Sequence, residues 1–246
     1  MVSDAGAVGD AGPGSKASLW EDFVDIFYAP TSVFARRTDG KFGMPLLFLA
    51  VVCAVLAFLT KNAMQPVMDA EFARRTAQMM RQNPNLTAEQ MASGRGFFET
   101  LGPLFFAIGI TISVFGTGLV LWAVGKLFDA KESAAAAIMI AAYAEMPRIV
   151  QILVNAAQGL FMPPEKLTSM YAIGLSPARF MDPDHASAVV MALASRIDPF
   201  VIWITVLLAI GLHVIGKIPK QQAYIAAAIT WVVGALPALF GAVRGG

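Results

Sequence analysis

The chain has 246 residues, of which 57% are hydrophobic and only 14% are charged, and its net charge is +1. Soluble globular domains carry about 25% charged residues, so the composition excludes a water-soluble enzyme or DNA-binding domain. The mean hydropathy of +0.64 indicates a polytopic membrane protein, and the near-neutral charge gives no sign of a nucleic-acid partner. The one cysteine, Cys53, excludes an intramolecular disulfide or a zinc cluster built from cysteines.

Residues 1–17 are rich in Gly, Ala and Ser and lack the apolar core of a signal peptide. We expect a disordered leader there and one membrane domain over residues 18–246. Ser18 and Glu21 have the spacing of a capping box, which starts a short helix, and Pro30 ends it. Its apolar face comprises Leu19, Trp20, Phe23, Ile26 and Phe27. This face either lies on the membrane surface or docks onto the protein's own membrane helices.

Five apolar stretches follow, and each is close to or above the length of about 20 residues that crosses a bilayer as a helix. They run over about 42–60, 100–125, 133–162, 199–216 and 222–243. The sequence therefore predicts an all-α fold, a polytopic membrane protein with about five transmembrane helices and further amphipathic helices at the N-terminus and in the loops. Pro147 interrupts the third stretch, which either crosses fully or returns to the same side.

Two long polar loops separate the apolar stretches. In the first loop, Met64, Met68 and Phe72 recur at roughly helical spacing, which predicts an amphipathic helix outside the bilayer. Its methionine-rich face packs on lipid or on the protein itself, or it forms an adaptable binding surface. In the second loop, the pair Asp182 and Pro183 is typical of a helix start.

The short basic loops predict the orientation, because Lys and Arg near span ends favour the cytoplasmic side. With the N-terminus inside, that side holds Arg36, Arg37, Lys41, Lys126, Lys131, Lys217 and Lys220. The opposite side carries more basic residues in total, but most of them lie in long loops, which cross largely regardless of charge. We expect a multi-pass protein of the cell inner membrane with a cytoplasmic N-terminus and the C-terminus outside.

The sequence contains no catalytic constellation. The two histidines, His185 and His213, lack the spacing of a zinc site on a helix, and no nucleophile turn of the form G-x-S-x-G is present. The glycines before Lys126 do not form a phosphate-binding loop, because Leu127 stands where Ser or Thr is required. We expect no enzyme, no catalytic residue, no cofactor and no metal site.

The most informative polar residues lie within the third apolar stretch. Glu145 and Arg148 flank Pro147, and an ionisable group at membrane depth costs at least about 2.5–3.5 kcal/mol and often marks function. Gln151 and Asn155 continue a polar stripe after the break. These residues form a candidate site that lines a cavity or a partner-binding notch in a broken helix. Alternatively, two short helices meet at an interface there and the charges never contact lipid.

Three segments share an order and spacing that match a known family. The first holds Trp20, Phe23, Phe27, Pro30 and Phe34, followed by a basic pair and a span; the second is Ala142-Tyr143-Ala144-Glu145-Met146-Pro147; the third runs from Asp198 and Pro199 through Trp203. Together they resemble the Yip1-domain family of five-span membrane proteins, over nearly the whole chain. The resemblance assigns docking or structural roles to the five residues of the first segment and to Asp198 and Trp203.

What this resemblance implies differs between groups of relatives. Eukaryotic members bind small GTPases and other Yip1-type proteins in early secretory trafficking, whereas some bacterial members accompany ABC-type exporters. The Ala- and Gly-rich composition is typical of a bacterial chain. We therefore expect an accessory or scaffolding subunit of a larger membrane assembly, with the lipid bilayer and other integral membrane proteins, or a second copy of itself, as partners. The alternatives are a small transporter or channel that uses the broken third span, and a membrane-organising or trafficking adaptor.

Overall fold

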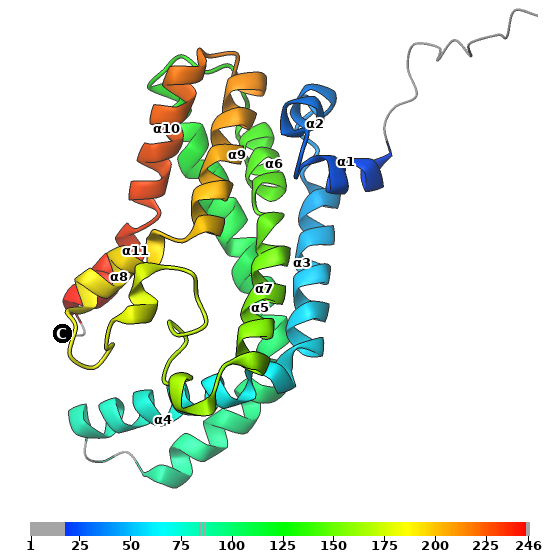
Figure 1. Ribbon diagram of the computed structural model, residues 1–246. Helices are drawn as coiled ribbons and strands as arrows, with labels where there is room; N and C mark the ends of the chain where they lie inside the picture. The colour runs from blue at the N-terminus through cyan, green and yellow to red at the C-terminus, as the bar shows by residue number, and fades with distance from the viewer. Residues whose placement is uncertain (1–17, 84, 86, 245–246) are drawn as a thin grey trace, which may run out of the picture.

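The computed structural model describes residues 18–83, 85 and 87–244; the predicted leader over 1–17 lies outside this range. The described residues form helices and connecting loops without strands, which confirms the predicted all-α class (Figure 1). The α-helices are α1 Leu19–Asp25, α2 Pro30–Arg36, α3 Gly43–Leu59, α4 Lys61–Gln82, α5 Ala88–Lys126, α6 Ala134–Ala144, α7 Pro147–Phe161, α8 Ala188–Arg196, α9 Pro199–Gly216, α10 Lys220–Val233 and α11 Leu236–Arg244. Two 3₁₀ turns, η1 Pro164–Lys166 and η2 Pro177–Phe180, lie between α7 and α8.

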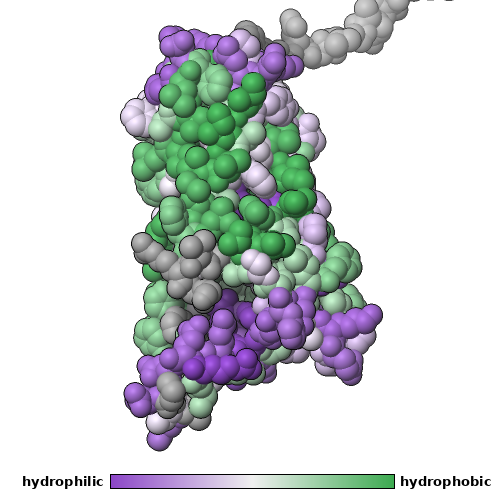
Figure 2. Space-filling view, turned by 90° about the vertical axis from the view of Figure 1, so that its left-hand side faces the viewer, coloured by the Kyte–Doolittle hydropathy of each residue, from purple (hydrophilic) through white to green (hydrophobic). Residues whose placement is uncertain are grey.

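Four segments are long and apolar enough to cross a membrane: Thr100–Lys126, Ala134–Phe161, Pro199–Gly216 and Lys220–Gly241. Helix α3 has 17 residues and bends by 79° into α4, so the two form a fifth candidate only as a bent pair. These four or five helices confirm a polytopic membrane protein. The molecular surface agrees, because an apolar band separates two hydrophilic ends (Figure 2).

Helix α6 lies at the centre of the bundle, against α3, α5 and α9. Every residue from Ala136 to Ala144 is buried. Because most of these residues are alanines, neighbouring backbones approach closely, as small residues allow in membrane helices. A Cβ atom added to Gly118 of α5 would stand 2.6 Å from the Ile138 Cα, and one added to Gly211 of α9 would stand 2.5 Å from a side-chain carbon of Ile140.

Two of the membrane segments are broken by a short turn. Glu145 and Met146 separate α6 from α7, and Gly234 and Ala235 separate α10 from α11. The first break was predicted from Pro147, which has no backbone N–H to continue the helix. The second break was not predicted, although a proline also occupies the second position of α11.

The two ends of the bundle differ in what they carry. Helices α1 and α2 lie at the same end as the short α5–α6 and α9–α10 loops, whereas α4, α8 and the long α7–α8 connection lie at the other (Figure 1). Helix α4 runs across the bundle at that end, and the helix predicted there from the methionine spacing is confirmed.

The helix start predicted at Asp182 is wrong, since α8 begins at Ala188. The Asp182 carboxylate instead accepts hydrogen bonds from the Asp184 N–H and the His185 ring in a turn.

The loop between α5 and α6 buries a carboxylate. The Glu132 side chain is inaccessible to solvent, and its oxygens have no hydrogen-bond partner within the described protein. They lie against Gly125 and Gly216, where an added Cβ would stand 2.5 and 2.8 Å from them. The Lys126 ammonium is 4.0 Å away, but it donates to the carbonyls of Ala130 and Glu132 at 2.7 and 2.6 Å. Burial raises the pKa of Glu132 above its ordinary value of 4.5.

We predict that Glu132→Gln raises the thermal unfolding midpoint in detergent near neutral pH. A carboxyl whose pKa is higher in the folded state destabilises the fold fully above that folded pKa, and not at all below the unfolded value of about 4.5. The difference in unfolding midpoint between the variant and the unmodified protein should therefore become smaller as the pH falls toward 4.5. A midpoint lowered at neutral pH would show that the charge contributes favourably.

We also predict opposite effects of the same substitution at two glycines of α5. Gly118→Ala places a methyl group against the α6 backbone and should cost about 1–3 kcal/mol, as overpacking does. Gly116→Ala meets nothing within 4 Å and should be neutral or stabilising, because alanine favours a helix over glycine by about 1 kcal/mol. Thermal unfolding of both variants measures this difference, and equal midpoints would contradict the close approach of α5 and α6.

Candidate functional site

The break between α6 and α7 is stabilised by a charged pair. Glu145 occupies the C-terminal cap of α6 and is only 4% exposed. Its Oε2 accepts a hydrogen bond from Arg148 Nε at 2.6 Å, three residues along the chain. The Arg148 Nη1 also donates to Gln151 Oε1 at 3.2 Å. Both charges of the third stretch are therefore neutralised against each other inside the protein.

Asp198 extends this network to a second membrane helix. Its Oδ1 accepts from Gln151 Nε2 at 3.4 Å and from the Phe200 N–H at 2.9 Å, which caps the start of α9. Its Oδ2 accepts from the Leu175 N–H at 3.2 Å, in the α7–α8 connection. We call Glu145, Arg148, Gln151 and Asp198 the Glu145 cluster. It connects the α6–α7 break, the start of α9 and the long connection.

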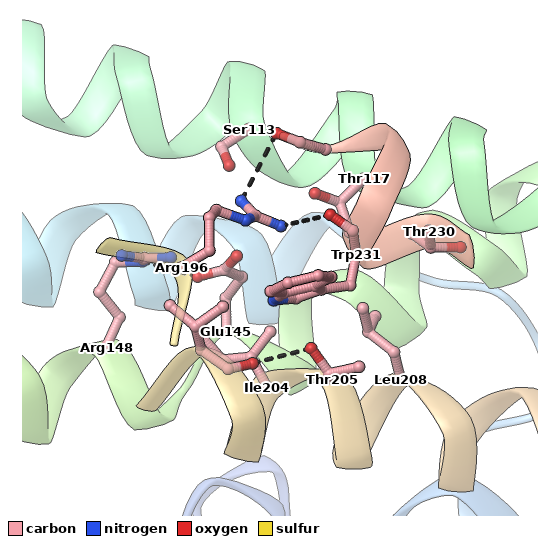
Figure 3. Close-up of a pocket in the computed structure, with 12 residues that line it drawn as sticks. Ser113, Thr117, Glu145, Arg148, Arg196, Ile204, Thr205, Leu208, Thr230 and Trp231 are labelled. Carbon is pink, nitrogen blue, oxygen red and sulfur yellow. Dashed lines mark hydrogen bonds and ion pairs between the residues drawn. The ribbon is translucent and has the colours of Figure 1, made fainter. Parts of the chain in front are cut away.

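The Glu145 cluster borders a polar cavity of about 130 Å³ that both helix breaks approach (Figure 3). Its lining comprises Ser113, Thr117, Glu145, Arg148, Arg196, Val201, Ile204, Thr205, Leu208, Thr230, Trp231 and Gly234. The hydroxyls of Thr205 and Thr230 donate to carbonyls of their own helices. Toward the cavity, these hydroxyl oxygens can therefore act only as hydrogen-bond acceptors. Ligand pockets measure about 300–1,000 Å³, so this cavity has room for water or a very small polar solute.

Arg196 of α8 stabilises the second break. Its Nη2 donates to the Trp231 carbonyl at 2.7 Å and its Nη1 to the Gly234 carbonyl at 3.5 Å, two backbone acceptors at the end of α10 (Figure 3). Its guanidinium lies 5.3 Å from the Trp231 ring centroid, a cation–π distance. Burial, and then the neighbouring charge of Arg148, lower the pKa of Arg196 below its ordinary value.

The N-terminal helices are held by a second charged group. The Asp22 carboxylate of α1 is fully buried, and its Oδ1 accepts from Arg36 Nη2 at 2.8 Å. Its Oδ2 accepts from Arg37 Nε at 2.5 Å and from the Tyr143 hydroxyl of α6 at 3.4 Å. We call these four residues the Asp22 cluster. Because Tyr143 and Glu145 are two residues apart, the last turn of α6 belongs to both clusters.

Aromatic contacts fix the inner face of the same helices to the bundle. Phe23 stacks on Phe48 of α3, with ring centroids 3.8 Å apart and planes at 7°. Phe34 is fully buried and meets the Tyr143 ring edge-on at 6.3 Å. Phe27 meets Trp203 of α9 edge-on at 5.7 Å. Of the two roles left open for this face, the structure shows docking onto the protein's own membrane helices for Phe23, Ile26 and Phe27, whereas Trp20 is exposed.

Most of the residues singled out from the sequence fall into two groups. The first group lies together at the α6–α7 break and comprises Glu145, Pro147, Arg148, Gln151 and Asp198. The second group lies where α1 and α2 pack on the bundle, which we call the N-terminal docking face, and comprises Phe23, Phe27, Phe34 and Trp203, with Pro30 at the first position of α2. Trp20 makes T-shaped contacts with Phe23 and Phe48 but is 70% exposed. Asn155 is the exception: it lines a different, mainly apolar cavity.

Sequence reasoning missed two contributors to these sites. Arg196 belongs to no motif of the sequence, and no local pattern indicates that it reaches the end of α10. Asp22 stands out in no motif of the sequence, and Arg36 indicates only the orientation in the membrane. Their pairing across 14 residues depends on the turn between α1 and α2.

Comparison with known proteins agrees with the resemblance seen in the sequence. The family model described as the Yip1 domain matches residues 24–241. This range contains the Glu145 cluster and most of the N-terminal docking face. No curated protein and no solved structure matches the chain.

We predict that Asp22→Asn loosens α1 and α2 from the bundle. It leaves two arginines without their carboxylate, at a cost of about 1–3 kcal/mol, below the range for fully buried pairs because both arginines reach solvent. Hydrogen exchange of residues 19–37 should accelerate. Asp25→Asn is the matched control, since Asp25 binds Arg36 from the more exposed side and should have a smaller effect. Equal exchange in both variants would contradict a special role for Asp22.

Proposed function

Because the chain belongs to the Yip1-domain family of membrane proteins, we propose that it is a non-enzymatic accessory or scaffolding subunit of a larger membrane assembly. The assembly we propose is an ABC-type exporter of the bacterial inner membrane, in line with what the resemblance implies for bacterial members. The non-enzymatic part of the proposal rests on the sequence, which offers no catalytic motif.

The observation that carries this proposal is an exposed, largely apolar stripe along α1 and the turn that follows it. Trp20, Val24 and Tyr28 follow one another at intervals of four residues and are 70%, 60% and 71% exposed. The opposite face of α1 is fixed by Asp22 and Phe23. Rigidly presented aromatic side chains are the residues that most often dominate binding energy at interfaces. The stripe therefore supports a surface for another protein.

The charge of α1 favours a protein partner over the lipid surface. Helices that bind membrane surfaces typically carry Lys and Arg on their polar face, but the charged residues of α1 are Glu21, Asp22 and Asp25. Anionic headgroups would repel the exposed Glu21. The phenol of Tyr28 donates to Asp25 at 2.5 Å, which lowers the pKa of Asp25 and keeps that carboxylate ionised.

The arrangement of basic loops supports a cytoplasmic position for this surface. The loop with Lys126 and Lys131 meets the loop with Lys217, since the Lys131 N–H donates to the Gly216 carbonyl at 2.9 Å. Both loops lie at the end that carries α1 and α2 (Figure 1). Short loops rich in Lys and Arg favour the cytoplasmic side, so the proposed partner is met there.

We predict that a photo-crosslinking amino acid at Val24 forms a covalent adduct with one other membrane protein in the native membrane. The matched control is Leu127, which is 76% exposed at the same end but lies outside the stripe. The adduct at Val24 should be at least about tenfold more abundant than at Leu127, as expected for a position in the centre of an interface. Mass spectrometry identifies the adduct, and lipid adducts alone at Val24 would contradict the proposal.

A second candidate function, a small transporter or channel, is favoured by one specific observation. The breaks in two membrane segments lie beside the same polar cavity, with Glu145, Arg148 and Arg196 around it. In secondary transporters, binding sites are typically formed where discontinuous helices meet. Because the cavity is small, transport of anything larger than a few atoms would require the helices that line it, among them α5, α9 and α10, to move apart.

We predict for this second candidate that proteoliposomes carry a flux that Glu145→Gln reduces. The substitution keeps the shape of the side chain and removes the charge that pairs with Arg148 beside the cavity. Flux is measured with a pH-sensitive dye and small-ion gradients against empty vesicles. Thr111→Val, on the α5 helix but outside the cavity lining, is the control. Flux equal to that of empty vesicles would exclude the transporter.

A further inference from the structure

A groove separate from the Glu145 cavity lies at the end of the bundle opposite α1 and α2. It has a volume of about 610 Å³ and is formed where α3 bends into α4, with α5 and α7 as its other walls. Its apolar lining includes Ala57, Phe58, Met64, Phe106 and Ile152. The volume and the apolar lining fall within the range of small-molecule binding sites.

The floor of this groove is fixed in place by α4. A Cβ atom on Gly159 of α7 would stand 2.4 Å from the Ala63 carbonyl, so the two helices are in backbone contact. Further along α4, Glu71 accepts from Arg74 and Arg75 at 2.8 and 2.5 Å and also from the Met170 N–H at 3.4 Å. Since Met170 belongs to the groove lining, the same contacts hold its wall. The groove is a preformed feature of the fold.

Two polar side chains of the lining have hydrogen-bonding capacity to spare. Lys61 lies over the Phe58 ring at 4.9 Å, and no carboxylate of the described residues pairs with it. The half-buried Asn155 amide makes no hydrogen bond to the described residues. By contrast, the hydroxyls of Thr60 and Thr100 are satisfied by carbonyls of the preceding turn. A ligand of this groove is therefore largely apolar and carries a negative charge beside a hydrogen-bond acceptor.

We propose that the groove binds one anionic phospholipid, with an acyl chain along the apolar walls and the phosphate beside Lys61. Lys61 is the first residue after the apolar helix α3 and its bounding Thr60, so it stands at the level where headgroups meet the hydrocarbon region. Among the residues that the structure describes, no Asp or Glu belongs to the groove lining, and the positive charge of Lys61 attracts a phosphate. The Asn155 amide donates to an ester or phosphate oxygen. The site is independent of the proposed partner surface on α1.

Native mass spectrometry of the full-length, delipidated protein in detergent tests this proposal. Palmitoyl-oleoyl phosphatidylglycerol should bind with one molecule per protein, ahead of the phosphatidylcholine with the same chains. Ala57→Phe places a ring in the groove and should weaken this binding about tenfold, because the lipid chain and the added side chain compete for the same space. Val51→Phe adds the same ring to a half-exposed position of α3 outside the groove and should bind as the unmodified protein does. Thermal unfolding confirms that both variants are folded.

A second pair of variants tests the headgroup contact. Lys61→Gln should remove about fivefold of the preference for phosphatidylglycerol, the contribution of one lysine near an anionic surface. Lys41→Gln, at the other end of α3, should preserve that preference. Equal binding of both lipids by the unmodified protein, or unchanged phosphatidylglycerol binding in Ala57→Phe, would overturn the proposal. Binding that survives in Lys61→Gln with unaltered preference would overturn the assignment of the phosphate to Lys61.

Discussion

The structure depends on the complete burial of one alanine-rich helix. Alanines bring the neighbours of α6 into backbone contact, so that no polar group can be tolerated along its length without a partner. Its polar side chains are confined to the last turn, where Tyr143 reaches Asp22 and Glu145 reaches Arg148. Burying one partner of a charged pair without the other is strongly unfavourable. Tyr143 therefore determines where α1 and α2 dock, and Glu145 determines the direction of α7 after the break.

This constraint connects the two candidate sites. The Asp22 cluster and the Glu145 cluster share the last turn of α6, and Asp198 extends the second cluster to α9. Trp20 and Val24 lie on the same helix as Asp22, whose carboxylate accepts from Tyr143 near the helix end that carries Glu145. The scaffolding and transporter hypotheses are therefore not structurally independent.

Much of the fold was predictable from the sequence because membrane helices are specified by uninterrupted apolar length. The five stretches, the break at Pro147 and the capping box at Ser18 all follow from local patterns. The N-terminal aromatic residues were recognised by their family-like spacing, and their contacts with Phe48 and Trp203 followed only from the structure. What could not be predicted depends on contacts distant in sequence: Arg196 reaching the end of α10, and Asp22 pairing with Arg36 and Arg37. Local pattern also failed at Asp182, where a side chain that can cap a helix instead forms a turn.

The central claim is that this Yip1-domain protein is a subunit of a larger membrane assembly, and the mass of the particle it forms tests that claim most directly. Tagged protein extracted from its native membrane in mild detergent would be weighed by native mass spectrometry, and the copurified chains identified. The account predicts a complex with another integral membrane protein at close to one copy each. A monodisperse particle that contains this chain and lipid alone would contradict it.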